Sequence, residues 1–183
     1  MTAMRLKGAF WWFITIYSGT MFPFQMYVIP LYKMYTWLGT YDTRLGMILF
    51  YTAVCIPFST LVLRNFFTTV SEEIPEAARV DGCGHFRIFW SMYLPLSKSA
   101  LAVLFLFQFT WIWNDLLFGL TLSNSPGVRP VMPALDGLMG IYSSTSMPVL
   151  LAGCLVASAP TVLLFAGLQR YFMQGLTLSA KAS

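Results

Sequence analysis

The chain has 183 residues, of which 57% are hydrophobic and only 10% are charged, and its mean hydropathy is +0.68. An ordinary globular chain is about 25% charged, so these few charges exclude a soluble domain. The net charge of +4 is small and spread along the chain. It forms neither the basic stripe that grips nucleic acid nor the polybasic block that holds a protein to anionic lipid. We therefore expect a protein embedded in membrane lipid that does not bind nucleic acid.

Four apolar segments are each long enough to cross a bilayer, which requires about 20 mostly apolar residues. These segments are approximately residues 8–29, 45–63, 99–120 and 147–172. Each must be helical, because backbone groups in hydrocarbon need hydrogen-bond partners within the chain. The sequence therefore predicts an all-α, polytopic membrane protein with about four transmembrane helices.

The orientation follows from the distribution of Lys and Arg, which favour the cytoplasmic side. Four spans place both termini and the loop between the second and third spans on one side. That side carries eight basic residues: Arg5, Lys7, Arg64, Arg79, Arg87, Lys98, Arg170 and Lys181. The opposite side carries three: Lys33, Arg44 and Arg129. We therefore predict a multi-pass protein of the cell (inner) membrane, with both termini and residues 68–98 in the cytoplasm.

The cytoplasmic loop, residues 68–98, has the pattern of a helix, a turn and a second helix. Pro75 suits the first helical turn, where its missing N–H costs nothing, and Glu76 is favoured near the same helix end by the helix dipole. Gly82 suits the left-handed conformation that ends many helices. The second half is rich in bulky apolar residues that need to pack, in part on the chain's own spans. The small, acidic first half is then left to meet a partner, although a solvated connection would also fit this pattern.

No pattern of metal-binding or catalytic residues is apparent. His85 is the only histidine, and no two of Cys55, Cys83 and Cys154 have the spacing of a metal or redox site. The segment 82–84 lacks the Lys-Ser/Thr that completes a phosphate-binding loop. We therefore expect no metal, no cofactor, no catalytic residue and no ATP hydrolysis by this chain.

Asp115 is the one acidic residue inside a predicted span, and Asn114 stands beside it. A charge at that depth is expensive, and such residues usually face a cavity or a partner. Two interpretations stay open: a role in a translocation path or in helix packing, and simple placement at the outer interface.

A spacing within the loop resembles the signature of a known family. Glu76-Ala77-Ala78, three further residues, Gly82 and then Leu94-Pro95 are similar to the EAA loop of permease subunits in binding-protein-dependent ABC importers. The segments 113–115 (Trp-Asn-Asp) and 169–177 are similar to the carbohydrate branch, in particular the maltose-type permease subunit.

The resemblance implies a function and a set of partners. The chain would be a permease subunit of an ATP-driven importer, carrying a sugar or oligosaccharide, and not itself an enzyme. Its coupling loop would seat on ATP-binding cassette ATPase subunits through Glu76, Ala77, Ala78, Asp81 and Gly82. A second permease subunit would complete the pore, and an extracytoplasmic solute-binding protein would deliver the solute. Asn114 and Asp115 would be candidates for the translocation path.

The chain departs from the family in length. Members of this branch usually have six spans, so the resemblance implies one transmembrane permease domain, residues 1–183, that is incomplete at its N-terminus. An inactive truncated remnant is one alternative, and a secondary transporter without an ATPase is another. Secondary transporters usually carry ionisable coupling residues at mid-membrane, and three of the four predicted spans have none. This favours the importer.

Overall fold

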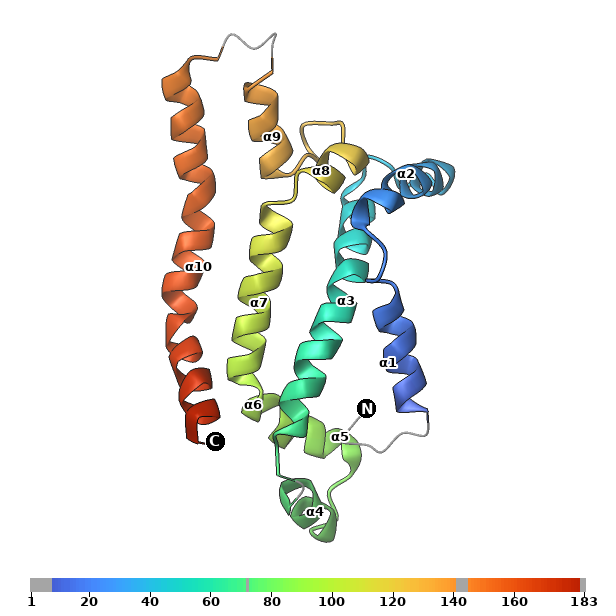
Figure 1. Ribbon diagram of the computed structural model, residues 1–183, viewed down its shortest axis with the longest axis vertical. Coiled ribbons are helices and arrows are strands. Elements are labelled where there is room, and N and C mark those ends of the chain that lie inside the picture. The colour runs from blue at the N-terminus through green and yellow to red at the C-terminus, as the bar shows by residue number, and fades with distance from the viewer. Residues whose placement is uncertain (1–7, 72, 141–144, 182–183) are drawn as a thin grey trace. The chain divides into compact units, whose positions relative to one another are not determined.

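The computed structural model describes residues 8–71, 73–140 and 145–181, and the regular structure in these ranges is helical (Figure 1). The all-α class is therefore confirmed. In chain order the elements are α1 (Ala9–Ser18), the 3₁₀ turn η1 (Phe24–Tyr27), α2 (Val28–Trp37), α3 (Arg44–Thr68), α4 (Glu73–Val80), α5 (His85–Ile88), the π-helical segment η2 (Phe89–Tyr93), α6 (Leu94–Leu96), α7 (Lys98–Trp113), α8 (Leu117–Leu122), α9 (Val131–Leu138) and α10 (Met147–Lys181).

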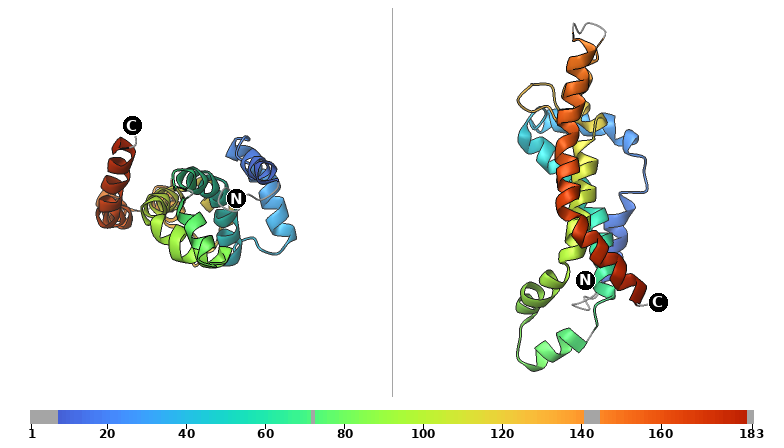
Figure 2. Two further views of the ribbon diagram at one scale, coloured as in Figure 1. Left: turned by 90° about the horizontal axis from the view of Figure 1, so that it is seen from below. Right: turned by 90° about the vertical axis from the view of Figure 1, so that its left-hand side faces the viewer.

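Two helices of the described ranges, α3 and α10, are long and apolar enough to cross a membrane. They match the second and fourth predicted spans, and α10 runs without interruption through Pro160 (Figure 2). A third span results if the segments His85–Leu96 and Lys98–Trp113, which are bent by 71°, are counted as one. The number of spans found by length and composition is thus two or three, against about four expected from the sequence.

The other two predicted spans are interrupted for local reasons. The first segment breaks after α1, where Gly19 caps the helix and Pro23 takes an extended ψ of 131°. Glycine is a poor helix former, and proline lacks the N–H that would continue the ladder. The third segment breaks after Trp113, because the side chain of Asp115 binds backbone N–H groups of the next helix. Such side-chain bonds compete with continuation of the helix.

The chain divides into two compact units. Unit 1 comprises Met1–Gly19, Ile56–Leu106 and Leu168–Ser183, and unit 2 comprises Thr20–Cys55 and Phe107–Gly167. Unit 1 contains the predicted cytoplasmic loop, and unit 2 contains Asn114 and Asp115.

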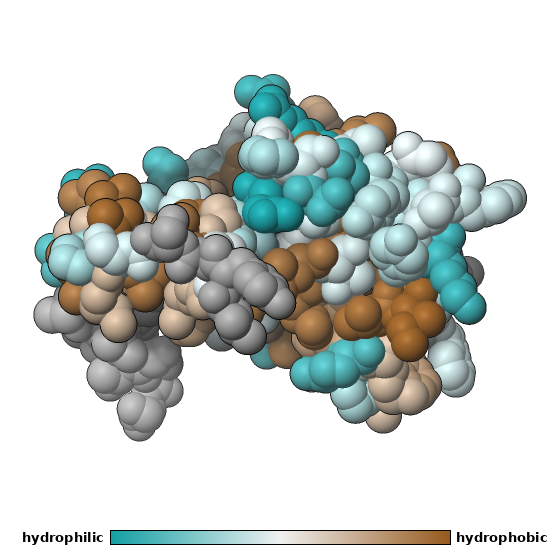
Figure 3. Space-filling view, turned by 90° about the horizontal axis from the view of Figure 1, so that it is seen from above, coloured by the Kyte–Doolittle hydropathy of each residue, from teal (hydrophilic) through white to brown (hydrophobic). Residues whose placement is uncertain are grey.

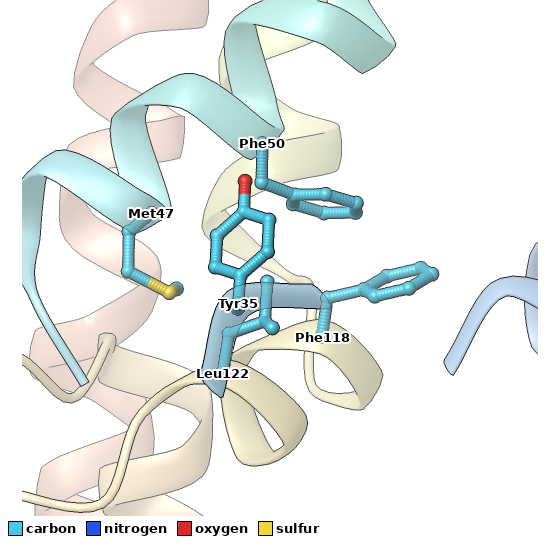
Figure 4. Close-up of a cluster of buried hydrophobic side chains, with 5 residues drawn as sticks. All are labelled: Tyr35, Met47, Phe50, Phe118 and Leu122. Atoms are coloured by element: carbon cyan, nitrogen blue, oxygen red, sulfur yellow. The ribbon is translucent and has the colours of Figure 1, made fainter. Parts of the chain in front are cut away.

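The core of unit 2 is a hydrophobic cluster from α2, α3 and α8, which consists of Tyr35, Met47, Phe50, Phe118 and Leu122 (Figure 4). The rings of Phe50 and Phe118 lie 4.4 Å apart between centroids, and the Tyr35 hydroxyl donates to the Gly46 carbonyl at 3.2 Å. A Cβ at Gly46 would lie 2.2 Å from the Thr40 carbonyl oxygen. The close approach of the chain there therefore requires glycine.

Asp42 joins the two connecting loops of unit 2. Its carboxylate accepts the backbone N–H groups of Asn124 and Ser125 at 2.8 and 2.9 Å, and also the Ser125 hydroxyl. These hydrogen bonds lower the pKa of the Asp42 carboxyl below its ordinary value, and the bond from the Ser125 hydroxyl has the largest effect.

On the face of the molecule seen in Figure 3, hydrophilic residues gather in one part while apolar residues remain exposed beside them.

In unit 1, α4 has the start and the stop that the sequence predicts. The Ser71 hydroxyl accepts the Glu73 backbone N–H at 3.3 Å, and Pro75 lies in the first turn. At the other end Gly82 has φ +79°. The N–H of Gly82 donates to the Arg79 carbonyl at 3.0 Å, and that of Cys83 donates to the Ala78 carbonyl at 2.9 Å. This pair of bonds is the Schellman motif that closes a helix on a left-handed residue.

The left-handed cap gives a matched pair of glycine variants. Gly82→Ala should destabilise the end of α4 by about 1–2 kcal/mol, because an L side chain is strained in that conformation. Gly84→Ala should be nearly neutral, since Gly84 has φ −69° and ψ 158°, and a Cβ there meets open space. Amide hydrogen exchange across residues 77–83 measures the difference. Equal exchange in the two variants would contradict this account of the cap.

Candidate functional site

Helix α4 has one face buried in its own loop and one face exposed. Pro75 and Ala78, three residues apart, are both buried, and Ala78 is only 1% exposed. The exposed side chains of α4 and its cap are Glu73, Ile74, Glu76, Ala77, Arg79, Val80 and Asp81. Because residues three and four apart share a face of a helix, Glu73, Ala77 and Val80 form a stripe, which we call the exposed face of α4.

The buried side of α4 rests on a small hydrophobic core. Ala78, Ile88 and Tyr93 are its buried members, and Phe67, Val70, Cys83, Phe89 and Met92 pack around them. The rings of Tyr93 and Phe67 meet edge to face with centroids 5.3 Å apart, and Phe67 belongs to the last turn of α3. The expectation that the second half of the loop packs on the chain's own spans is therefore confirmed.

The structure separates two alanines that the sequence analysis treated alike. We expected Ala77 and Ala78 both to let a partner approach the helix closely. Ala78 instead fills a position inside the loop's own core, because it follows Pro75 by three residues on the buried face. Ala77 is exposed, and beside it on the same face Val80 is 88% exposed. Of the two alanines, only Ala77 therefore belongs to the exposed face of α4.

Two aromatic residues extend this apolar surface along the loop. Phe86 is 77% exposed and Trp90 is 54% exposed, with ring centroids 6.0 Å apart. Singly exposed apolar residues are ordinary, but neighbouring large ones mark an interaction site or contact with lipid. The loop of residues 68–98 thus combines a packed inner side with an outer side that is partly acidic and partly apolar.

In unit 2, each residue of Trp113-Asn114-Asp115 makes its own hydrogen bond. The Trp113 indole N–H donates to the Ala157 carbonyl of α10 at 2.8 Å. The Asn114 side-chain amide donates to the Thr110 carbonyl at 2.7 Å and is exposed. An Asp115 carboxylate oxygen accepts the Tyr51 hydroxyl at 2.9 Å and the Gly119 backbone N–H at 3.0 Å. This tripeptide therefore ties the end of α7 to α3, α8 and α10.

Asp115 has a packing role in addition to any role in a path. Its charge is met by a phenol and by the first N–H groups of α8, where the helix dipole favours an anion. The residue is partly buried, and one carboxylate oxygen makes only a long contact, 3.5 Å, with the Phe118 N–H. That oxygen retains capacity to accept a further hydrogen bond.

Two further polar residues, Tyr51 and Gln108, belong to this region and were not singled out from the sequence. The Gln108 amide N–H donates to the Cys55 carbonyl at 3.1 Å, and the Cys55 thiol donates to the Gln108 carbonyl oxygen at 3.2 Å. The signal that identifies Gln108 is its spacing of seven from Asp115, which would place both on one face of the helix that the sequence predicts over residues 99–120. In the structure α7 ends at Trp113, two residues before Asp115. Within the described part of the chain, no group of three or more His, Cys, Asp or Glu is placed to hold a metal ion.

The chain is similar to known transport proteins over nearly its whole length. It is 37% identical over 162 residues to a probable ABC transporter permease protein of Pyrococcus horikoshii, covering 88% of this chain and 58% of the relative. It is 35% identical over 160 residues to an alpha-glucoside transport system permease protein of Rhizobium meliloti, covering 84% of this chain and 42% of the relative. The chain therefore spans about half the length of these curated relatives.

The fold is also similar to that of a solved transporter. A chain in the crystal structure of a bacterial ABC transporter involved in the import of the acidic polysaccharide alginate aligns with a TM-score of 0.73 and 26% identity. The alignment covers 92% of this chain and 63% of the solved one. Residues 2–178 match the family described as the binding-protein-dependent transport system inner membrane component. This chain belongs to that family.

Proposed function

We propose that the chain is a permease subunit of an ATP-driven importer and that its cytoplasmic loop couples an ATPase to solute movement. The observation that carries the proposal is the two-sided build of α4. Its inner side is packed on the last turn of the spanning helix α3, through Ala78, Tyr93 and Phe67. Its outer side is exposed. A helix held in this way can receive a partner on one side and act on a membrane span on the other.

The partners of this importer follow from its class. ATP-binding cassette ATPase subunits would supply the energy, since this sequence contains no phosphate-binding loop. A second permease subunit would complete the pore, and an extracytoplasmic solute-binding protein would deliver the solute. The description of the family as binding-protein-dependent, and the naming of the Pyrococcus relative as a permease, support these assignments.

The exposed face of α4 would seat on the ATPase. Ala77 lies at its centre, where a small side chain lets another surface approach the helix backbone. Glu73 and Val80 flank it and offer a charge and an apolar contact, respectively. The apolar area of Val80 would be removed from water on docking, at about 25 cal/mol per Å².

Ala77→Trp should prevent co-purification of the ATPase subunit, because the indole occupies the space that docking needs. Ala134→Trp is the matched control, since Ala134 is an exposed alanine of α9 in unit 2. Ala78→Trp should also block assembly, but by unpacking the loop's core, which faster proteolysis of residues 73–93 would show. Normal recovery of the ATPase with Ala77→Trp would sink the docking assignment.

We further propose that the loop and both termini are cytoplasmic, as the distribution of Lys and Arg predicts. In a background without native cysteines, Ser91→Cys and Met139→Cys place single thiols in the second-to-third loop and at the end of α9. Met139 is 67% exposed. An impermeant thiol reagent added to intact cells should label the Met139 site and leave the Ser91 site unlabelled until the membrane is opened. Labelling of the Ser91 site and not of the Met139 site in intact cells would show that the orientation is the opposite of the proposed one.

The proposed solute is a sugar or oligosaccharide, and Asn114 and Asp115 are proposed to line its path. The second carboxylate oxygen of Asp115 and the exposed amide of Asn114 can bond hydroxyl groups. The alpha-glucoside permease among the relatives supports this class of solute.

Asp115→Asn should lower solute uptake by about tenfold, the order expected when a hydrogen bond to a charged group is weakened. The amide keeps an acceptor for Tyr51 and Gly119, so assembly and the basal ATPase rate should not change. Asp136→Asn, which removes an exposed carboxylate from α9, serves as the control. The comparison is radiolabelled uptake against ATP hydrolysed in the same membranes. Equal uptake in both variants would restrict Asp115 to packing.

A further inference from the structure

Helices α3 and α7 contact each other in unit 2 through a row of polar and aromatic side chains. Cys55 pairs with Gln108 through the two hydrogen bonds given above. One helical turn away, the Tyr51 hydroxyl binds Asp115 at 2.9 Å, and its ring meets Trp111 with centroids 6.5 Å apart. We call these five residues the polar seam. Tyr51 and Cys55 are spaced by four on α3, and Gln108 and Trp111 by three on α7, so each pair follows one face of its helix. Asp115 lies two residues beyond the end of α7.

The seam lies in otherwise apolar helices. Residues 45–63 of α3 and 99–113 of α7 contain no Lys, Arg, Asp or Glu. Hydrogen bonds between membrane helices contribute only modestly to helix association, so apolar packing would hold two helices as well. Polar residues at such positions are usually functional. Adhesion between α3 and α7 is therefore a poor explanation of the seam.

The chemistry of the seam restricts how it can separate. An amide or phenol left without a hydrogen-bond partner in hydrocarbon is strongly unfavourable. Water, or the hydroxyl groups of a solute, can replace each bond and remove this cost. The two sides of the seam can therefore part only into a space that contains water or a hydroxylated molecule.

We propose that the polar seam is a wall of the solute path, closed here by its own pairs, which opens to water during the transport cycle and suits uncharged polyhydroxylated solutes. Trp111 offers a partly exposed ring face, and Gln108, Tyr51 and Asp115 offer donors and acceptors. The only formal charge in the seam is the carboxylate of Asp115, so an anionic solute would find repulsion and no cation there. This inference rests on the proposed function and extends the path beyond Asn114 and Asp115.

The native thiol of Cys55 lies in the polar seam, so its reaction with a thiol reagent measures whether water reaches the seam. The test uses the assembled transporter with Cys83→Ser and Cys154→Ser. A small hydrophilic methanethiosulfonate should label Cys55 several-fold faster in one of the two states of the ATPase subunits, ATP-bound or nucleotide-free, than in the other. The control retains Cys154 alone, on an exposed apolar part of α10. Cys154 should stay unlabelled by the hydrophilic reagent in both states, because lipid or a neighbouring helix excludes it.

The charge of the reagent tests the class of solute. Asp115 lies seven residues after Gln108, the partner of Cys55, and two residues beyond the end of α7. At the helical rise of 1.5 Å per residue this is on the order of 10 Å. At that distance a carboxylate should favour a cationic over an anionic methanethiosulfonate by about twofold or more, after each rate is divided by its rate with free cysteine. Asp115→Asn should bring this ratio close to one.

The outcomes separate the inference from the function on which it depends. If the ATPase assembles and hydrolyses ATP with solute uptake while Cys55 is labelled in no nucleotide state, the seam is not part of the path. If the anionic reagent reacts as fast as the cationic one, the preference for uncharged solutes is wrong. If no ATPase assembles with the chain, the proposed function fails and the inference fails with it.

Discussion

The structure depends on one constraint: in a chain this poor in charge, every polar group among the apolar helices must find its partner within the protein. Water is absent from hydrocarbon, and an unpaired donor or acceptor there costs several kcal/mol. The constraint explains why α7 stops where it does. Asp115 cannot be left uncompensated, so it takes the Tyr51 hydroxyl and the Gly119 N–H, and α8 begins at that point. The same constraint pairs the Gln108 side chain with the thiol and the backbone carbonyl of Cys55.

The loop of residues 68–98, proposed to be cytoplasmic, meets the opposite demand, since outside the membrane water competes for its polar groups. Its solution is a small core beneath a short helix. An eight-residue helix is marginal alone, because helical stability in proteins comes mainly from packing. Ala78 and Pro75 supply that packing on one side, and Gly82 fixes the end of the helix by its left-handed cap. The acidic and apolar residues on the other side do not contribute to this core.

Local features of the fold were predictable from the sequence, and long-range ones were not. The first-turn position of Pro75 and the left-handed conformation of Gly82 depend on backbone chemistry within a few residues. The inward placement of Ala78 depends on Ile88 and Tyr93, which are ten and fifteen residues away, so composition alone did not distinguish Ala78 from the exposed Ala77. The pairing of Tyr51 with Asp115 joins residues 64 apart in sequence. The helix predicted over residues 8–29 is interrupted, because hydropathy does not register that Gly19 and Pro23 stop a helix.

The edge-to-face contact of Tyr93 with Phe67 has a mechanical consequence. Protein cores are packed as densely as organic crystals and deform little, so α4 and the last turn of α3 must shift together. A push applied to the loop then acts at the end of a helix of 25 residues, which measures about 38 Å at 1.5 Å per residue. Within the loop, the same three buried side chains, Ala78, Ile88 and Tyr93, therefore support α4 and join it to the end of α3.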